Sequence, residues 1–448
     1  MEDKLIRVAI THGDTNGIGY EVILKTFEEP GMLELCTPII YGSPKAAAYH
    51  RKMLDLQTNF CIISSAEEAQ EGRVNLLATF DEEVKIEVGQ PSAEAGEAAL
   101  KALDRAMTDY RSGLYDVLVT APINKNTIQS DQFHFCGHTE YIENCVGEGQ
   151  KALMILMNGS LRVALVTTHL PIKDVAKAIT KEAIVEKTKT FHTSLKRDLR
   201  IDNPRIAVLA LNPHSGDNGL LGSEESEAII PAIEELEAAG IQAFGPYPAD
   251  GFFGSGMYNR FDGVMAMYHD QGLAPFKALA IEDGVNFTAG LPIVRTSPDH
   301  GTAYDIAGKG IADANSFRQA IYTAIDVYRN RISYDEPLEN PLPKLYHEKR
   351  DESEKARFAM PRPKDQFRRE GRPVRDERHA KPAANGSPAP ADSGSKTPAD
   401  NAVEATAGLS RPDAGNAPAT ENAQTSVSQS AETTAVTPSE TNNRKAEE

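Results

Sequence analysis

The stretch VMAMYHDQGLAPFK, from Val264 to Lys277, carries the pattern on which the fold assignment rests. Apolar residues run into Tyr268, and His269 and Asp270 then arrive together before a glycine, a proline and the lysine. A short apolar run that ends in turn residues is typical of a buried strand. The stretch therefore predicts a strand that brings an imidazole and a carboxylate to the edge of a sheet.

The same kind of run recurs through residues 1–340, where it alternates with amphipathic helical segments. This alternation is typical of an α/β fold with a largely parallel sheet. A helix is expected between Ser92 and Gly113, with the glycine at its carboxyl end, and Ser316 is expected to cap a later helix. Candidate strands begin at Leu5, Pro38, Tyr115, Leu161, Pro204 and Asp262.

Composition and charge exclude several classes of protein. The chain has 448 residues, with 65 acidic and 47 basic side chains and a formal charge of -18. A sequence-independent grip on nucleic acid or on an anionic membrane is therefore not expected. There is no apolar run of about 18 residues and no signal-peptide pattern, and the four cysteines form no CxxC pair. We expect a soluble, cytoplasmic protein.

The composition changes after about residue 340. Residues 341–381 are rich in mixed charge, which indicates a solvated linker, with weak contact to an acidic partner as the alternative. Residues 382–448 contain no aromatic residue, no isoleucine and no methionine. Such a segment buries too little apolar surface to offset its conformational entropy, so we expect a disordered, low-complexity tail.

Three strand-like runs end in a histidine, at His169, His214 and His269. In an open α/β sheet, ligands gather at the carboxyl ends of the strands, so we expect these imidazoles at the same edge. One such histidine alone is more often a structural residue, whereas three are better explained by a shared divalent cation. Three neutral imidazoles leave coordination positions open for a substrate oxygen, which is the pattern of a catalytic metal site.

A second group of residues is suited to anions. Lys277, Asn286 and Arg295 combine two cations with an amide donor, and together they could hold a phosphate or a carboxylate. His138 and Thr139 follow a glycine turn that leads into a helix, where backbone N–H groups also favour an anion. The alternatives are solvated surface charges and, for the histidine, a buried structural role.

Asp270 could orient an imidazole or a metal-bound water, or accept a proton, and we favour the orienting role. The N-terminal THGDTNGIGYE, residues 11–21, is a glycine-rich turn between a strand and a helix. It matches neither GxGxxG nor GxxxxGK[ST], so it indicates a tight turn more strongly than a phosphate loop.

Several segments, taken in order, resemble the 4-hydroxythreonine-4-phosphate dehydrogenase family. They are APINKNTI, GHTEYI, VTTHLPI, LNPHSGDNG, YPAD, MYHDQGLAPFK and GVNFTAGLPIVRTSPDHGTAYDIAGKG. The resemblance runs from about Leu5 to about Tyr328. At the N-terminus the family usually shows TPGEPAGIGPE, and here His12 and Tyr20 replace two of its prolines.

The resemblance implies a fold similar to isocitrate and isopropylmalate dehydrogenases, with two interleaved α/β/α lobes in residues 1–340 and an active-site cleft between them. It implies a homodimer with the active site near the subunit interface. The implied reaction is NAD- or NADP-dependent oxidation of 4-phosphooxy-L-threonine to 2-amino-3-oxo-4-phosphooxybutanoate. This acid loses carbon dioxide to give 3-amino-2-oxopropyl phosphate, in pyridoxal 5'-phosphate biosynthesis.

The resemblance also implies roles for individual residues. One divalent ion per active site, zinc, magnesium, cobalt or manganese, falls to His169, His214 and His269. Substrate contacts fall to His138, Thr139, Lys277, Asn286 and Arg295, and the catalytic residues are expected to be Asp270 and Lys277. The segment DHGTAYDIAGKG is similar to the HGSAPDIAGKG loop of isopropylmalate dehydrogenases, which lies along the adenosine of the dinucleotide, and so assigns cofactor binding to His300, Gly301, Thr302 and Asp305.

Three other functions remain open at this point. A paralogous dehydrogenase of a phosphorylated sugar acid, 4-phospho-D-threonate or 4-phospho-D-erythronate, would share the anion-binding residues. A metal-dependent phosphoesterase would suit the three histidines and the basic cluster, although the nucleotide-like loop speaks against it. A scaffold that binds partners through its tail is a third alternative.

Overall fold

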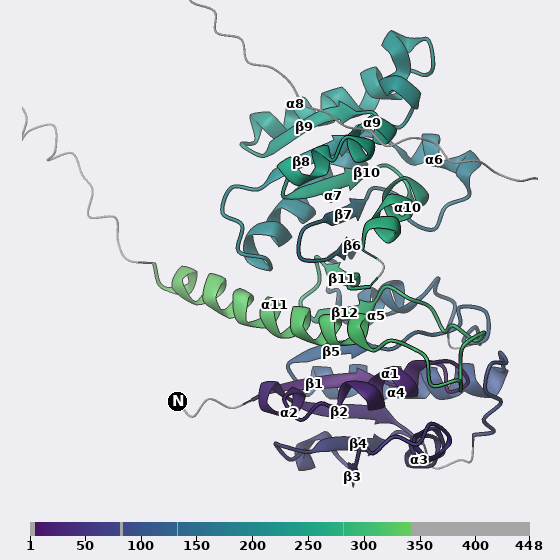
Figure 1. The fold of residues 1–448 in the computed structure, drawn as a ribbon. Helices are drawn as coiled ribbons and strands as arrows, with labels where there is room; N and C mark the ends of the chain where they lie inside the picture. The colour runs from purple at the N-terminus through teal and green to yellow at the C-terminus, as the bar shows by residue number, and fades with distance from the viewer. Residues whose placement is uncertain (1–4, 81–83, 132, 281, 342–448) are drawn as a thin grey trace, which may run out of the picture. The chain divides into compact units, whose positions relative to one another are not determined.

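The computed structural model describes residues 5–341, except 81–83, 132 and 281. The predicted tail (382–448) and all but the first residue of the predicted linker (341–381) lie outside the described residues. The described part forms one twelve-stranded sheet with helices on both faces (Figure 1). None of its helices is long and apolar enough to cross a membrane. The predicted α/β fold with a largely parallel sheet is confirmed.

The elements are given in chain order. The strands are β1 (Ile6–Thr11), β2 (Cys36–Gly42), β3 (Phe60–Ile63), β4 (Val74–Ala78), β5 (Val117–Thr120), β6 (Leu153–Met157), β7 (Arg162–Leu165), β8 (Arg205–Leu209), β9 (Gln242–Tyr247), β10 (Gly263–Ala266), β11 (Val285–Ala289) and β12 (Val294–Pro298). The α-helices are α1 (Gly19–Thr26), α2 (Met32–Leu35), α3 (Pro44–Met53), α4 (Ala93–Arg111), α5 (His138–Val146), α6 (Ile172–Ala178), α7 (Lys181–Arg197), α8 (Ile230–Ala238), α9 (Ala249–Gly254), α10 (His269–Leu279) and α11 (Asn315–Glu339).

Two blocks of parallel strands make up most of the sheet, whose order is β3-β4-β2-β1-β5-β12-β11-β6-β7-β10-β8-β9. The first block ends at β12, and the second begins at β7. Between them, β11 and β6 are antiparallel to each other and to their outer neighbours. The two blocks consequently run in opposite directions, so the carboxyl ends of their strands do not share one edge of the sheet.

Two helix boundaries test the sequence signals. Helix α4 begins after Ser92, whose hydroxyl accepts a backbone N–H in its first turn, and Gly113 follows its end with a φ of 68°. This matches the predicted helix. Ser316 is not a cap, because α11 already begins one residue earlier. Its hydroxyl instead donates to Gly284 O (2.7 Å) and accepts from Asp299 N (3.3 Å), which fixes the helix to the loops around β11 and β12.

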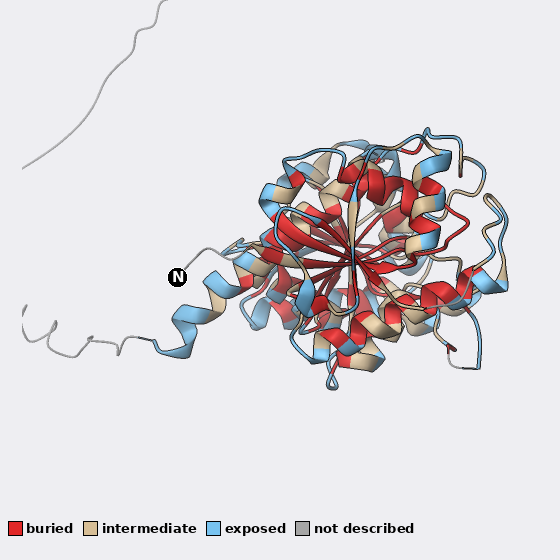
Figure 2. Ribbon diagram, turned by 90° about the horizontal axis from the view of Figure 1, so that it is seen from below, coloured by how far each residue is buried: buried red, intermediate tan, exposed pale blue. Residues whose placement is uncertain are grey.

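The two faces of the sheet are covered differently. On one face, α1, α11, α7 and α8 share a single apolar core that extends under both blocks. On the other face, α4 and α5 pack against the first block, whereas α9 and α10 pack against the second, in two separate clusters. Figure 2 shows buried strands at the centre and exposed residues on the outer sides of the helices. The second face is therefore covered by two layers of helices, with the central strands between them.

The two N-terminal departures from the family pattern contact each other. The ring of buried His12 stacks on that of Tyr20, with centroids 5.1 Å apart and planes 10° from parallel, and Tyr20 stacks in turn on His50. The Tyr20 hydroxyl accepts the Ser43 backbone N–H at 2.9 Å. Aromatic stacking thus occupies the positions where the family has prolines, and a change at one of them affects the other.

Burial makes His12 a source of acid sensitivity. Desolvation lowers the pKa of His12 from 6.5 to about 4, so the folded state keeps the ring neutral while the unfolded state binds a proton below pH 6.5. The free energy of unfolding should fall as pH drops from 6.5 towards 4, by roughly 3 kcal/mol from this residue. In urea unfolding curves across this range, His12→Phe should flatten the pH dependence.

The exposed His134 provides the control, because His134→Phe should leave the pH dependence unchanged. If the free energy of unfolding depends on pH in the same way for wild type and His12→Phe, the buried ring does not couple folding to pH.

Candidate functional site

A cavity of about 290 Å³ lies on the central strands. Arg295 and Ser297 of β12, Asn286 of β11, and Met154 and Leu156 of β6 line it. On β11 and β6, these residues alternate with members of the continuous core on the opposite face, because successive side chains of a strand point to opposite sides. On β12, Val294 belongs to that core, and Thr296, between Arg295 and Ser297, donates to the Ala320 carbonyl of α11. The cavity thus occupies the face of the sheet between the two separate helical layers.

Arg295 is the most deeply buried charge in this cavity, with 3% of the residue exposed. Its guanidinium donates to the hydroxyl of Thr120 (2.6 and 3.1 Å) and to that of Thr288 (3.1 Å). Within the described residues no carboxylate forms an ion pair with it. Desolvation lowers the pKa of Arg295 to about 10, which still leaves it charged at neutral pH. A bound anion would supply the ion-pair partner that the described residues do not.

Helix α5 contributes its first residues to the same cavity. His138 begins the helix directly after Gly137, and its Nδ1 lies 3.4 Å from Nη2 of Arg295. Desolvation, followed by the positive charges of Arg295 and Lys125, lowers the pKa of His138, so its imidazole is neutral at pH 7. Thr139 also lines the cavity. These groups, with the N-terminal turn of the helix, form a local environment suited to an anion.

Lys277 enters from helix α10. Its Nζ lies 3.4 Å from Asp299 Oδ1 and donates to the backbone carbonyl of Asp299 at 3.0 Å. Burial raises the pKa of Asp299, opposed by the nearby lysine. His300 and Gly301, which come directly after, also line the cavity. The structure therefore brings the predicted anion-binding residues and two of the predicted cofactor residues together.

The other two predicted cofactor residues do not line the cavity. Thr302 packs on the N-terminal glycine turn: its carbonyl accepts the Ile18 N–H at 3.1 Å, and a Cβ on Gly17 would lie 2.7 Å from that carbonyl oxygen. Asp305 is exposed on the same loop. The glycine turn thus supports the loop that follows β12, and only a residue without a side chain fits at Gly17.

Two of the three strand-end histidines meet. The ring centroids of His169 and His269 are 6.2 Å apart, and both rings border the cavity. His169 Nδ1 lies 3.1 Å from Glu140 Oε1, and its Nε2 lies 3.0 Å from Lys125 Nζ. His269 Nδ1 lies 2.6 Å from Asp270 Oδ1, the contact that an orienting role for this carboxylate requires. That role remains a prediction.

His214 follows β8, which neighbours β10, but it does not line the cavity. It begins a run of residues with positive φ that continues to Gly219. The buried carboxylate of Glu225 holds the preceding chain by accepting the N–H groups of Leu211 (2.9 Å) and Asn212 (2.8 Å). Between residues 5 and 341, the described side chains form no group of three His, Cys, Asp or Glu that could hold a metal ion. The three-histidine metal site remains a prediction.

Sequence reasoning did not single out Lys125, Glu140 and Asp299. The first two lie inside APINKNTI and GHTEYI, the motifs quoted for the resemblance, and the third precedes His300. All three line the cavity. Their motifs were the only available signal, because their contacts come from segments far apart in the sequence.

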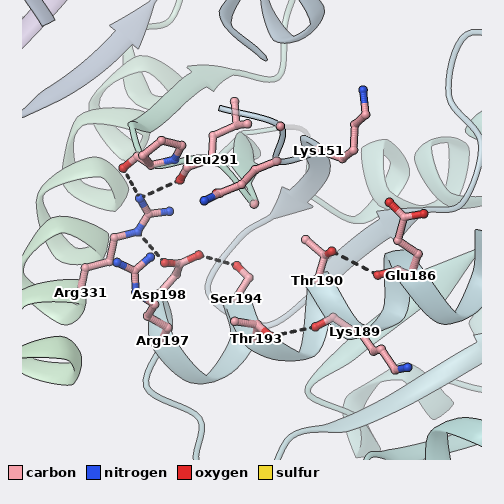
Figure 3. A pocket seen from close by; sticks show the side chains of 14 residues that line it. Lys151, Glu186, Lys189, Thr190, Thr193, Ser194, Arg197, Asp198, Leu291 and Arg331 are labelled. Carbon is pink, nitrogen blue, oxygen red and sulfur yellow. Dashed lines mark hydrogen bonds and ion pairs between the residues drawn. The ribbon is translucent and has the colours of Figure 1, made fainter. Parts of the chain in front are cut away.

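A larger cavity, of about 540 Å³, lies between α7, α11 and the turn that joins β11 to β12 (Figure 3). In Figure 3, the buried Arg331 guanidinium lies between Asp198 and the Leu291 carbonyl. The lysines and arginines that line this cavity all form ion pairs: Lys151 with Glu143, Lys189 with Glu235, Arg197 with Asp335, and Arg331 with Asp198. Because these charges are compensated, the smaller cavity is the better candidate for an anionic ligand.

The chain is similar to known proteins in sequence and in structure. Residues 34–324 match the family model described as pyridoxal phosphate biosynthetic protein PdxA. A 4-hydroxythreonine-4-phosphate dehydrogenase of Bacteroides thetaiotaomicron is 65% identical over 358 residues, which are 80% of this chain and 98% of that protein. A D-threonate 4-phosphate dehydrogenase of Cupriavidus necator is 39% identical over 74% of this chain and all of its own length. The crystal structure of the Klebsiella pneumoniae 4-hydroxythreonine-4-phosphate dehydrogenase superposes with a TM-score of 0.62 at 33% identity, covering 73% of this chain and 98% of that one.

Replacement by methionine should destabilise the protein strongly at one buried arginine and only weakly at another. Arg331→Met leaves the buried Asp198 without its partner and should lower the free energy of unfolding by about 3–5 kcal/mol. Arg295→Met removes a charge that has no carboxylate partner, so its effect should stay within about 1 kcal/mol. Urea unfolding measures both.

In the same experiment, millimolar inorganic phosphate should raise the melting temperature of wild type but not of Arg295→Met. Equal destabilisation by the two replacements, or an undiminished phosphate effect in Arg295→Met, would contradict the assignment of the uncompensated charge to an anion.

Proposed function

The chain belongs to the PdxA family of pyridoxal phosphate biosynthetic proteins, and from this premise we propose that it is a 4-hydroxythreonine-4-phosphate dehydrogenase. It would oxidise 4-phosphooxy-L-threonine to 2-amino-3-oxo-4-phosphooxybutanoate, which decarboxylates to 3-amino-2-oxopropyl phosphate. One observation carries the proposal for this chain: a single cavity contains a buried guanidinium with no ion-pair partner among the described residues, together with two lysines and four imidazoles.

We propose that the phosphate of the substrate binds to Arg295, Lys277 and Asn286, together with His138 and Thr139. The support is that all five line one cavity, with Arg295 and His138 3.4 Å apart. A charge-assisted clamp fixes both the position and the orientation of the substrate. Such orientation accounts for a large share of many enzymatic rate enhancements.

NAD or NADP would accept the hydride from the secondary alcohol. We propose that the loop from His300 to Asp305 binds the adenosine side of the cofactor. His300 and Gly301 border the cavity, and the N-terminal glycine turn holds Thr302, so the loop begins beside the proposed substrate site. This placement supports a dinucleotide that extends from the cavity along the loop.

We propose one divalent ion per active site, zinc, magnesium, cobalt or manganese, held by His169, His214 and His269. Bound there, it would polarise the substrate oxygen during oxidation and decarboxylation. The described residues of one chain fit this group only in part, because His169 and His269 share a cavity and His214 is outside it. We therefore propose that association of two copies completes the site, in a homodimer with the cleft between the lobes of residues 1–340 near its interface.

The remaining roles concern protons. Asp270 lies 2.6 Å from His269 Nδ1 and would keep the proton on that nitrogen, which leaves Nε2 as the lone-pair donor. Lys277 is our candidate for proton transfer at the substrate, because its Nζ enters the cavity beside Asp299. The cytoplasmic location remains a prediction from the sequence.

A complementation experiment tests the activity and the shared metal site together. His169→Ala and His214→Ala should each abolish NADH formation from the phosphorylated amino acid, and a chelator should do the same to wild type until a divalent salt is added. If each site takes the two histidines from different subunits, mixed dimers contain one intact site. After denaturation and refolding together, an equal mixture should recover about a quarter of wild-type activity.

His192→Ala, on α7 and outside the cavity lining, is the control and should keep full activity. Activity of wild type in chelator, or of either single variant, would contradict the metal site. No recovery in the refolded mixture would contradict its sharing between subunits.

A second dehydrogenase function is favoured by one finding, the 39% identity to the D-threonate 4-phosphate dehydrogenase. Its substrate would use the same phosphate clamp. The two candidate substrates differ at C2, which carries an ammonium group in the amino acid and a hydroxyl in the sugar acid. The choice between them depends on which side chain of the cavity contacts that group.

A further inference from the structure

Glu140 extends a carboxylate into the cavity from the first turn of α5. Its Oε1 accepts from His169 Nδ1 at 3.1 Å. Its Oε2 is buried and has no hydrogen-bond partner among the residues that the structure describes. The cavity therefore contains a buried carboxylate oxygen with unused capacity to accept a hydrogen bond.

The residues that line this cavity provide no hydrogen-bond donor for Glu140 Oε2 within the described part of the chain. A buried acceptor without a donor is costly, and for an ionised group the cost is larger than for a neutral one. The cavity is otherwise rich in donors for anions, namely Lys277, Arg295 and His138. Lys125, which also lines the cavity, donates to His169 Nε2 at 3.0 Å instead. A ligand that satisfies all of these groups carries anionic oxygens together with a positively charged N–H group.

We propose that Glu140 binds the α-ammonium group of the substrate and thereby makes this enzyme prefer a phosphorylated amino acid to the corresponding phosphorylated hydroxy acid. The inference rests on the proposed function and deepens it. The phosphate and the carboxylate of the substrate match the cations of the cavity, and the ammonium matches Glu140 Oε2. A C2 hydroxyl also donates a hydrogen bond, but it brings no positive charge to the carboxylate, so it is the weaker partner.

A purely structural role for Glu140 would use both oxygens, as a neighbouring carboxylate on the same helix does. Glu143 lies one turn further along α5, where its Oε1 accepts from Lys151 Nζ at 2.8 Å and its Oε2 accepts from the Ala152 N–H at 2.9 Å. Glu140 holds His169 with one oxygen only. The second oxygen is the part of this side chain that the fold does not use, which favours a role in ligand binding.

The test compares two substrates on three proteins. For wild type, Glu140→Gln and Glu143→Gln, kcat/KM is measured on 4-phosphooxy-threonine and on the analogue with a C2 hydroxyl. The amide of Gln can still accept from His169, so its main effect is to remove the charge. Glu140→Gln should lose roughly 10- to 100-fold on the amino acid, the range of a charge-assisted hydrogen bond, and less than about 3-fold on the hydroxy acid. Glu143→Gln should keep the wild-type ratio.

A second measurement covers the case in which Glu140→Gln folds poorly. Glu140→Asp keeps the charge, and it should retain more of the preference for the amino acid than any neutral residue does. In wild type, O-phosphoserine should also inhibit more strongly than 3-phosphoglycerate, because the pair differs at C2 by an ammonium and a hydroxyl.

Equal losses on the two substrates in Glu140→Gln would overturn the inference and leave Glu140 as a positioning residue for His169. No loss of kcat/KM on either substrate in Glu140→Gln would overturn it as well. So would equal inhibition of wild type by O-phosphoserine and 3-phosphoglycerate. The wild-type measurements alone test the proposed function. If wild type oxidises only the hydroxy acid, the proposed function fails, and Glu140 does not set a preference for an ammonium group.

Discussion

Arg295 places a positive charge within a twelve-stranded sheet, where its guanidinium bonds to hydroxyls but has no carboxylate partner among the described residues. Arg331 is almost as deeply buried, but it is compensated by Asp198 at 2.7 Å. The ion pair of Arg331 joins elements of the fold, whereas the charge of Arg295 is available to a ligand. The site follows from this, since the other donors of the cavity surround the charge that the fold leaves without a partner.

The division of the sheet into two blocks explains why such a place exists. The antiparallel strands β11 and β6 reverse the strand direction, so each block has its own helical layer on one face. The opposite face is covered by one continuous core, which makes the described part a single sheet and not two. Strands between the two layers can carry polar residues on their free side, as Asn286, Arg295 and Ser297 do. On β11, alternating polar and apolar residues satisfy both requirements. On β12, Val294 belongs to the continuous core, whereas Arg295 and Ser297 line the cavity.

Much of the fold was predictable because it depends on local patterns. Apolar runs that end in turn residues located β1, β2, β5, β7, β8 and β10, and the capping serine and the glycine located α4. The pairing of β11 with β6 was not predictable, because it joins segments that are far apart in sequence. Ser316 was misread as a cap because its hydroxyl serves contacts with distant loops, which no local pattern reveals.

The candidate site was predictable in part, because local sequence patterns indicate which residues lie at strand ends but not which distant residues they contact. The sequence shows that a residue lies at the end of a strand, but it does not show the direction of the side chain. The rings of His169 and His269 lie close together, whereas His214 lies on a turn with positive φ and does not join them. Arg295 was identified as a possible ligand, but its burial depends on neighbouring strands. Glu140 lies in the segment GHTEYI, and only its contact with His169 and its unused oxygen distinguish it from an ordinary helical carboxylate.

The interleaved order of the strands also constrains how the protein can be made. Strands β6 to β10 follow one another along the chain and pair mainly among themselves, whereas the first block lacks β12 until residues 294–298 have been synthesised. At ribosomal speed, the interval from Thr120 to Val294 lasts roughly 10–35 seconds, during which the edge of β5 has no neighbour on that side. An unpaired edge invites pairing with other chains. The second block can therefore complete its pairing during translation, whereas the nascent first block presents the open edge of β5 until the returning strand closes it.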